Sequence, residues 1–368
     1  MTPAELSRTV LATVRRAVAA GEFAVAVPER IVVQRPPRPG CGDYATNVAL
    51  QLAGPAGRTP YEVAEILGRR LSREPGIAQV EIAGAGFLNI TLSASAYGDV
   101  VRQVRAQPDE YGHGDGLADE AVTMTTPPVA PGTAPAAPST PPAAPPGQDP
   151  APGPTSPPSR APLVADVVNR LLRATGARPG PPETVTVAEP APEPAPPPPP
   201  ALPPPNGTTP LPPDETHWAL LRPPAEDTPR LTPDLLVQRE CNPLFRVRYA
   251  HSRTRALLRN AHDLGVEIEA PAQDPYRHPA ETELLGLLAD YPRVIETAAR
   301  RRAPDRVARH LERLADAFFR FHDECDPLPK GDEKPSAVHA ARIRLADATG
   351  IVLADGLRML GISAPDHM

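Results

Sequence analysis

The sequence predicts a multidomain chain with a small α+β domain at the N-terminus, a disordered proline-rich linker, and an all-α helical bundle at the C-terminus. Two observations divide the 368 residues in this way. The segment from Pro127 to Pro229 holds 35 of the 55 prolines, too many for continuous helix or sheet. Strand-like alternation occurs before this segment, whereas helical periodicity dominates after it. We therefore expect domains at 1–106 and 231–368, joined by a linker over 107–230.

The composition excludes several classes of protein. No run of about 18 apolar residues could cross a bilayer, and the N-terminus has Glu5 and several arginines where a signal peptide has an apolar core. Cys41, Cys241 and Cys325 have no CxxC spacing, so we predict neither a disulfide framework nor a zinc site. These features predict a cytoplasmic protein with no metal and no membrane partner.

Residues 1–106 combine helical and hairpin patterns. A second helix of this block is predicted to begin at Thr59, because threonine can cap a helix, Pro60 suits the first turn and Glu62 completes a capping box. Residues 79–92 alternate apolar and polar side chains around a Gly-Ala-Gly turn, which predicts a hairpin. The first helix is predicted from apolar residues at helical spacing, namely Leu6, Val10, Leu11, Val14 and Val18.

One island interrupts the prolines of the middle segment. The run "PLVADVVNRLLRATGA" at 162–177 has apolar residues at helical spacing and ends at Gly176. It predicts a short helix with little to pack against.

The last block, 231–368, is predicted to be a bundle of four or five helices. One helix opens at Pro304, and a long one spans 336–360. Their predicted buried stripes consist of Val307, Leu311, Leu314, Ala315 and Phe318 in the first, and Val338, Leu345, Val352 and Leu360 in the second.

The stretch "NPLFRVRYAHSRTRALLRNA" at 242–261 has five arginines and no acidic residue, in a chain of net charge −6. Arginine-rich helices are often only solvated faces. Guanidinium groups also suit phosphates and can stack on bases, and Tyr249 offers a ring for an unstacked base. The pattern alone leaves both interpretations open.

Several runs together resemble arginyl-tRNA synthetase over about two thirds of the chain, in the order of that family. The runs are "GDYATNVALQLA", "VEIAGAGFLNITL", "NPLFRVRYAHSRTRALLRN", "YPRVIETAARRRAPDRVARHLERLADAFFRFHDEC" and "RLADATGIVLADGLRMLGISAPDHM". The resemblance implies that 1–106 is the additional N-terminal domain that contacts the D-arm of tRNA. It implies that 231–368 is the helical anticodon-binding domain named for an Asp-Ala-Leu-Arg run. This chain departs from that run, reading Asp347-Ala348-Thr349-Gly350.

The same resemblance indicates that the catalytic domain is missing. The family's domain needs a His-x-Gly-His type motif at a helix N-terminus to hold ATP phosphates. Here "EAVTMTTPPVAPGTAPAAPSTPP" stands where the first strand and phosphate turn belong, and 162–177 resembles the helix after the motif without its histidines. The run "YGHGDG" at 111–116 has only one histidine. We predict no catalytic, cofactor-binding or metal-binding residue, and ATP would be needed only if ligase activity persisted.

The resemblance also supplies candidate tRNA-binding residues. Phe87 and Asn89 match the strand that contacts the D-arm, with hairpin packing as the alternative for Phe87. Arg246 stands where the family often has an aromatic residue, which puts that base contact in doubt. The positions that match anticodon contacts of the family are Tyr249, Arg253 and Met368. Together with the arginine block on the same segment, the predicted anticodon-arm contacts are Arg246, Arg248, Tyr249, Arg253, Arg255, Arg259 and Met368.

These observations predict a non-catalytic arginyl-tRNA synthetase paralogue that binds tRNA(Arg) or a tRNA-like structure. One alternative is arginine-tRNA ligase activity, as similarity to the family would suggest. Another is a scaffold whose proline-rich linker binds protein partners in extended conformation. The sequence does not decide which tRNA is bound or whether the two end domains dock on each other.

Overall fold

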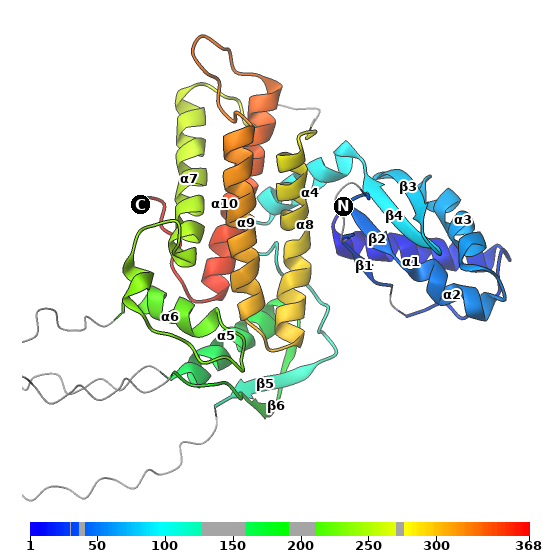
Figure 1. Cartoon of the computed structure of the whole chain (residues 1–368), viewed down its shortest axis with the longest axis horizontal. Coiled ribbons are helices and arrows are strands. Elements are labelled where there is room, and N and C mark those ends of the chain that lie inside the picture. Colours follow the sequence, from blue (N-terminus) through cyan, green and yellow to red (C-terminus); the bar gives the residue numbers. More distant parts are fainter. Residues whose placement is uncertain (30, 37–40, 127–158, 191–210, 270–275) are drawn as a thin grey trace, which may run out of the picture.

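The computed structural model describes residues 1–29, 31–36, 41–126, 159–190, 211–269 and 276–368 (Figure 1). None of the helices in these ranges is long and apolar enough to cross a membrane.

The N-terminal domain is the predicted α+β unit. Its four strands form an antiparallel sheet in the order β1-β2-β4-β3. Thr59 and Glu62 form the predicted capping box at the start of α3. The elements are α1 (Pro3–Ala19), β1 (Val33–Gln34), β2 (Tyr44–Thr46), α2 (Val48–Ala56), α3 (Pro60–Leu71), β3 (Ile77–Ala83), β4 (Phe87–Leu92) and α4 (Ala94–Ala106).

The predicted hairpin is confirmed as β3 and β4. Its alternation has a direct cause, because successive side chains of a strand point to opposite faces of the sheet. Leu88, Ile90 and Leu92 are buried in the domain core, whereas Phe87 on the opposite face is 42% exposed.

The middle of the chain is more ordered than the linker prediction allowed. Strands β5 (Ala121–Thr125) and β6 (Arg178–Thr184) pair in parallel, and α5 (Arg160–Ala174) lies between them in the sequence, as in a βαβ unit. The side-chain amide of Asn169 on α5 binds both backbone groups of Met124, at 2.8 Å and 3.0 Å. The short sheet is therefore fastened to its helix.

The prediction that this helix would have little to pack against was wrong. Val167, Val168 and Leu171 of α5 are fully buried, and α5 packs against α8 of the bundle, α6 (Pro213–Leu221) and β5. The periodicity gave the helix correctly, but its largest partner, α8, lies more than a hundred residues away in the sequence. The predicted disorder of 127–158 and 191–210 falls outside the described residues.

The C-terminal block is the predicted bundle, with four long helices. They are α7 (Pro243–Asp263), α8 (Pro279–Arg300), α9 (Asp305–Glu324) and α10 (Ala337–Met359), preceded by a short 3-10 turn, η1 (Pro233–Leu236). The predicted stripe of α9 is buried throughout. In α10 it is confirmed at Leu345 and Val352, and at Leu360 just after the helix, but Val338 is 39% exposed.

The N-terminal domain packs directly on the bundle. Helix α4 contacts α8 and α10, and α1 contacts α8 (Figure 1). The Arg35 Nε donates to Asp290 at 3.0 Å, and the Arg105 Nε donates to Asp347 at 2.8 Å. The two end domains are therefore docked on each other.

Candidate nucleic-acid interface

Helix α7 distributes the arginines of 242–261 over two flanks. Asn242 caps the helix by accepting from the backbone N–H groups of Leu244 and Phe245. One face of α7 is buried in the bundle, so the arginines occupy the sides of the remaining surface. Arg246 and Arg253 lie on the flank beside α9, where their partners are, and Arg248, Arg255 and Arg259 lie beside the C-terminal segment 362–368.

The flank beside α9 presents a stack of aromatic rings. The Tyr249 ring lies 5.5 Å from that of Phe245 and 5.8 Å from that of Phe319, in stacked geometry, and Tyr249 is 37% exposed. The Arg246 guanidinium lies 5.5 Å from the centre of the Phe319 ring and pairs with Asp316. Arg253 donates to His322 Nε2 at 3.0 Å. We therefore define the aromatic platform as Phe245, Tyr249 and Phe319.

Sequence reasoning selected only Tyr249 of this platform. Phe245 stands four residues before Tyr249, a spacing that places two side chains on one helix face. Phe319 follows the buried Phe318 and lies beside the apolar stripe of α9. The first spacing could have been read from the sequence, but the contact of Phe319 with α7 depends on the bundle.

The other flank lies beside α6 and the C-terminal segment. Arg248 donates to Asp214 at 3.1 Å and to Glu215 at 3.3 Å, both in the first turn of α6, and to the Ser363 hydroxyl at 2.7 Å. Its side chain is only 17% exposed. The Arg248 side chain thus links three segments of the protein.

The remaining residues of this flank stay accessible. The Arg255 guanidinium lies 3.3 Å from the Asp366 carboxylate, with both side chains at least two-fifths exposed. Arg259 donates to His367 Nδ1 at 3.4 Å, and Met368 is 51% exposed. These contacts bring the predicted C-terminal residue Met368 into the neighbourhood of α7.

Phe87 and Asn89 share the solvent-facing side of the N-terminal sheet. Asn89 pairs with Ala45 on one side and Glu81 on the other. The Phe87 ring is too exposed to be buried in the hairpin. In Figure 1 this sheet and α7 lie on opposite sides of the bundle, so the two groups of predicted residues form separate surfaces.

The N-terminus of α5 binds a carboxylate of the same chain, that of Glu189. The Glu189 carboxylate accepts from the backbone N–H groups of Arg160 and Ala161, at 2.7 Å and 3.0 Å, and from the Ser159 hydroxyl at 3.1 Å. Arg160 itself is buried and donates to six carbonyl oxygens, those of Ala188, Leu220, Pro223, Pro224, Ala225 and Asp227. A helix N-terminus favours negative charge, and here the chain supplies it.

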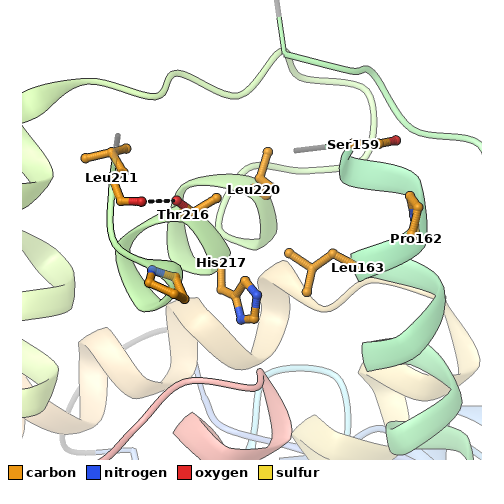
Figure 2. Close-up of a pocket in the computed structure, with 8 residues that line it drawn as sticks. Ser159, Pro162, Leu163, Leu211, Thr216, His217 and Leu220 are labelled. Carbon is orange, nitrogen blue, oxygen red and sulfur yellow. Dashed lines mark hydrogen bonds between the residues drawn. The ribbon is translucent and has the colours of Figure 1, made fainter. Parts of the chain in front are cut away.

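A pocket of about 440 Å³ lies beside this helix end, between α5 and α6 (Figure 2). Leucines and prolines form much of its lining, and His217 is the titratable side chain among the lining residues. The His217 ring donates from Nδ1 to the Gly361 carbonyl at 2.9 Å. The described lining residues therefore offer no pair of titratable groups for acid-base chemistry. Across the described residues no group of three or more His, Cys, Asp or Glu side chains is placed to hold a metal ion.

Two family models match the chain. The model described as the arginyl tRNA synthetase N terminal domain matches residues 5–92, and the DALR anticodon binding domain matches residues 247–368. The second match contains Arg248, Tyr249, Arg253 and Met368, and the first contains Phe87.

Curated relatives named arginine-tRNA ligase align with the whole chain. The protein from Frankia alni is 29% identical over 552 residues, with both chains covered completely. This chain has 368 residues, so at least 184 aligned positions have no counterpart in it. A shorter match to the protein from Clavibacter sepedonicus is 42% identical over 156 residues and covers 42% of this chain and 28% of that relative.

Solved structures share the fold. The Thermus thermophilus arginyl-tRNA synthetase matches with a TM-score of 0.60 at 12% identity, covering both chains completely. The enzyme from Plasmodium falciparum gives a TM-score of 0.61 at 8% identity, covering this chain completely and 99% of that chain. At these identities the likeness concerns the fold alone.

Proposed function

This chain belongs to the arginyl-tRNA synthetase family and lacks the family's catalytic domain, and on that premise we propose that it binds tRNA(Arg) or a tRNA-like structure without charging it. The observation that carries the proposal is the aromatic platform on α7 and α9, flanked by the arginines of α7. Aromatic rings accept unstacked bases, and guanidinium groups contact phosphates. A stack of rings with one exposed member, Tyr249, beside the cations of α7 suits a single-stranded loop and its stem.

The two flanks of α7 would contribute differently. Tyr249 has an exposed ring already stacked on Phe245 and Phe319, so a base could extend the stack at little conformational cost. Arg255 and Arg259 are accessible and have weak intramolecular partners that a phosphate could replace. Arg248 is largely enclosed by Asp214 and Glu215, so its role as a phosphate contact is the least supported of the three arginines.

The surroundings of the α5 N-terminus support the proposal that the protein does not aminoacylate tRNA. This helix resembles the one that follows the ATP-binding motif in the family, yet the residues before it contain no histidine pair. Glu189 occupies the backbone donors at its N-terminus, so a nucleotide phosphate would have to displace an attached carboxylate. Adenylate formation depends on such preorganised donors.

A filter-binding assay with total tRNA over a salt series tests the binding proposal. We expect affinity to fall steeply with salt, because bound arginines release counterions from the phosphates. Arg255→Gln should reduce the salt slope by about one unit if Arg255 contacts one phosphate. An exposed arginine distant from α7, Arg102, provides the matched control, and Arg102→Gln should leave the slope unchanged. No affinity for tRNA at low salt would refute the proposal.

An arginylation assay with ATP, arginine and tRNA(Arg) tests the absence of catalysis. We expect no arginyl-tRNA above a buffer control, with a full-length ligase as the positive control. Turnover that a point substitution in this chain abolishes would instead support arginine-tRNA ligase activity. If tRNA is neither charged nor bound, the scaffold hypothesis is the one to pursue, with its proline-rich segments as bait for protein partners.

A further inference from the structure

Asp214 lies at the junction of three segments that are distant in the sequence. It belongs to the first turn of α6, and its carboxylate accepts from Arg248 of α7 at 3.1 Å. The same carboxylate accepts from the backbone N–H of Ser363 at 3.3 Å and from the Ser363 hydroxyl. The side chain is only 22% exposed, so this junction is partly shielded from solvent.

The C-terminal segment 362–368 follows α7 from this junction onward. The Pro365 carbonyl accepts from His251 Nδ1 at 3.0 Å, and the Asp366 carbonyl accepts from Ser252 at 3.4 Å. Ser363 meets Arg248, Asp366 meets Arg255 and His367 meets Arg259, so the segment follows successive turns of the helix. An extended chain advances about 3.3 Å per residue and a helix about 1.5 Å, so a few extended residues can accompany three turns of α7.

We propose that Asp214 is a positioning residue for tRNA binding, because it anchors the C-terminal segment at the start of its path along α7. Anchored there, the segment sets where His367 and Met368 lie relative to Arg255 and Arg259. The inference rests on the proposed function, since it assigns Asp214 a role in tRNA binding although Asp214 lies outside the binding surface. Asp214 comes from the middle of the chain, outside both matched family domains.

The sign of one substitution separates positioning from simple electrostatics. Asp214 is negatively charged, so if it acted only through its field, its neutralisation would strengthen binding to a polyanion. If Asp214 positions the segment, Asp214→Asn should weaken binding although it removes a negative charge. Asp366 gives the matched comparison, because its carboxylate occupies Arg255 without anchoring α6. Asp366→Asn should therefore strengthen binding.

The experiment measures tRNA affinity and salt slope for full-length wild type, Asp214→Asn, Asp366→Asn and Ser363→Ala. We expect Asp214→Asn to lower affinity about tenfold, which corresponds to losing one hydrogen bond between charged groups. Its salt slope should stay unchanged, because Asp214 contacts no phosphate. Ser363→Ala changes no charge and should lower affinity in the same direction. The double variant should be no weaker than Asp214→Asn alone, because both substitutions release the same anchor.

Affinity of Asp214→Asn equal to or higher than that of wild type would overturn the inference while leaving tRNA binding by the protein intact. Absence of binding by wild type would overturn the proposed function itself. If Asp214→Asn fails to fold, Ser363→Ala decides the question, because unchanged affinity in that folded variant contradicts the anchor.

Discussion

Arg105 on α4 donates from Nε to the Asp347 carboxylate on α10 at 2.8 Å, across 242 residues of sequence. Asp347 opens the run that resembles Asp-Ala-Leu-Arg but reads Asp347-Ala348-Thr349-Gly350. The first residue of this run therefore links the N-terminal domain to the bundle. Its last residue serves the bundle itself, because a side chain at Gly350 would come within 2.4 Å of the Thr254 hydroxyl on α7.

Arg105→Ala should weaken the docking of the two end domains. The side chains of Arg105 and Asp347 are each about one-fifth exposed, so their ion pair is intermediate between an exposed and a buried one. We expect a loss of about 1–2 kcal/mol in the free energy of unfolding, measured by urea denaturation. Arg102→Ala on the same helix, whose side chain is 62% exposed, should cost less than about 0.5 kcal/mol. Equal losses for both variants would contradict a specific role of Arg105.

The sequence predicted those elements whose pattern reflects one dominant environment. The hairpin of β3 and β4 alternates because one face covers the domain core, and the stripe of α9 is buried throughout because the bundle surrounds it. The prediction for Val338 was wrong: it is exposed at the start of α10, and burial of the helix begins at the next residue, His339. Periodicity gives the face of a helix but not where along it the packing begins.

The candidate site was predictable as a segment but not as a surface. The arginine-rich run was identified from composition, yet its division into two flanks depends on which face of α7 the bundle buries. The enclosure of Arg248 depends on Asp214 and Glu215, from a segment that was expected to be linker. These partners are distant in the sequence, and the spacing of residues within one segment does not predict such contacts.

Arg160→Met should destabilise the middle region. Arg160 is 1% exposed and its guanidinium binds carbonyl groups from the chain around 188 and from 220–227. Removing it leaves several buried acceptors unpaired, and we expect a loss of about 3–5 kcal/mol. Arg173→Met provides the control on an exposed position of α5. Thermal unfolding should show a large shift for the first variant only, and similar melting temperatures would contradict this account.

His310 should make the protein sensitive to acid. Complete burial, together with the nearby charges of Arg313, Arg35 and Arg293, lowers the pKa of its imidazole to about 3. The folded state thus keeps His310 neutral where the unfolded chain, with an ordinary pKa of 6.5, binds a proton. Stability should therefore fall as the pH drops from about 6.5 towards 3, by at most about 1.4 kcal/mol per pH unit from this residue.

His310→Leu should remove that contribution. Carboxylates add to the acid response of both proteins, so the measurement is the difference between wild type and variant in urea denaturation at pH 7.5, 5.5 and 4.5. We expect the variant to lose less stability between pH 5.5 and 4.5 than wild type. His262→Gln, at an exposed position of α7, should follow the wild-type curve. Parallel curves for wild type and His310→Leu would show that the buried ring is not responsible.

Tyr249→Ala should weaken tRNA binding by about tenfold, since stacking of a base on an aromatic ring is worth about 1–3 kcal/mol. The salt slope should stay nearly the same, because the ring binds no phosphate. Tyr249→Phe retains the aromatic ring that stacks with Phe245 and Phe319 and should keep most of the affinity.

Stability has to be measured on the same samples, because Tyr249 also packs against Phe319 of α9. Val338→Ala removes a similarly exposed apolar side chain from α10 and serves as the control for a general loss of surface area. A folded Tyr249→Ala variant with wild-type affinity would mean that the platform does not accept a base. If Tyr249→Phe weakened tRNA binding as much as Tyr249→Ala, the contribution of Tyr249 to affinity would come from its hydroxyl group. Stacking would then no longer explain it.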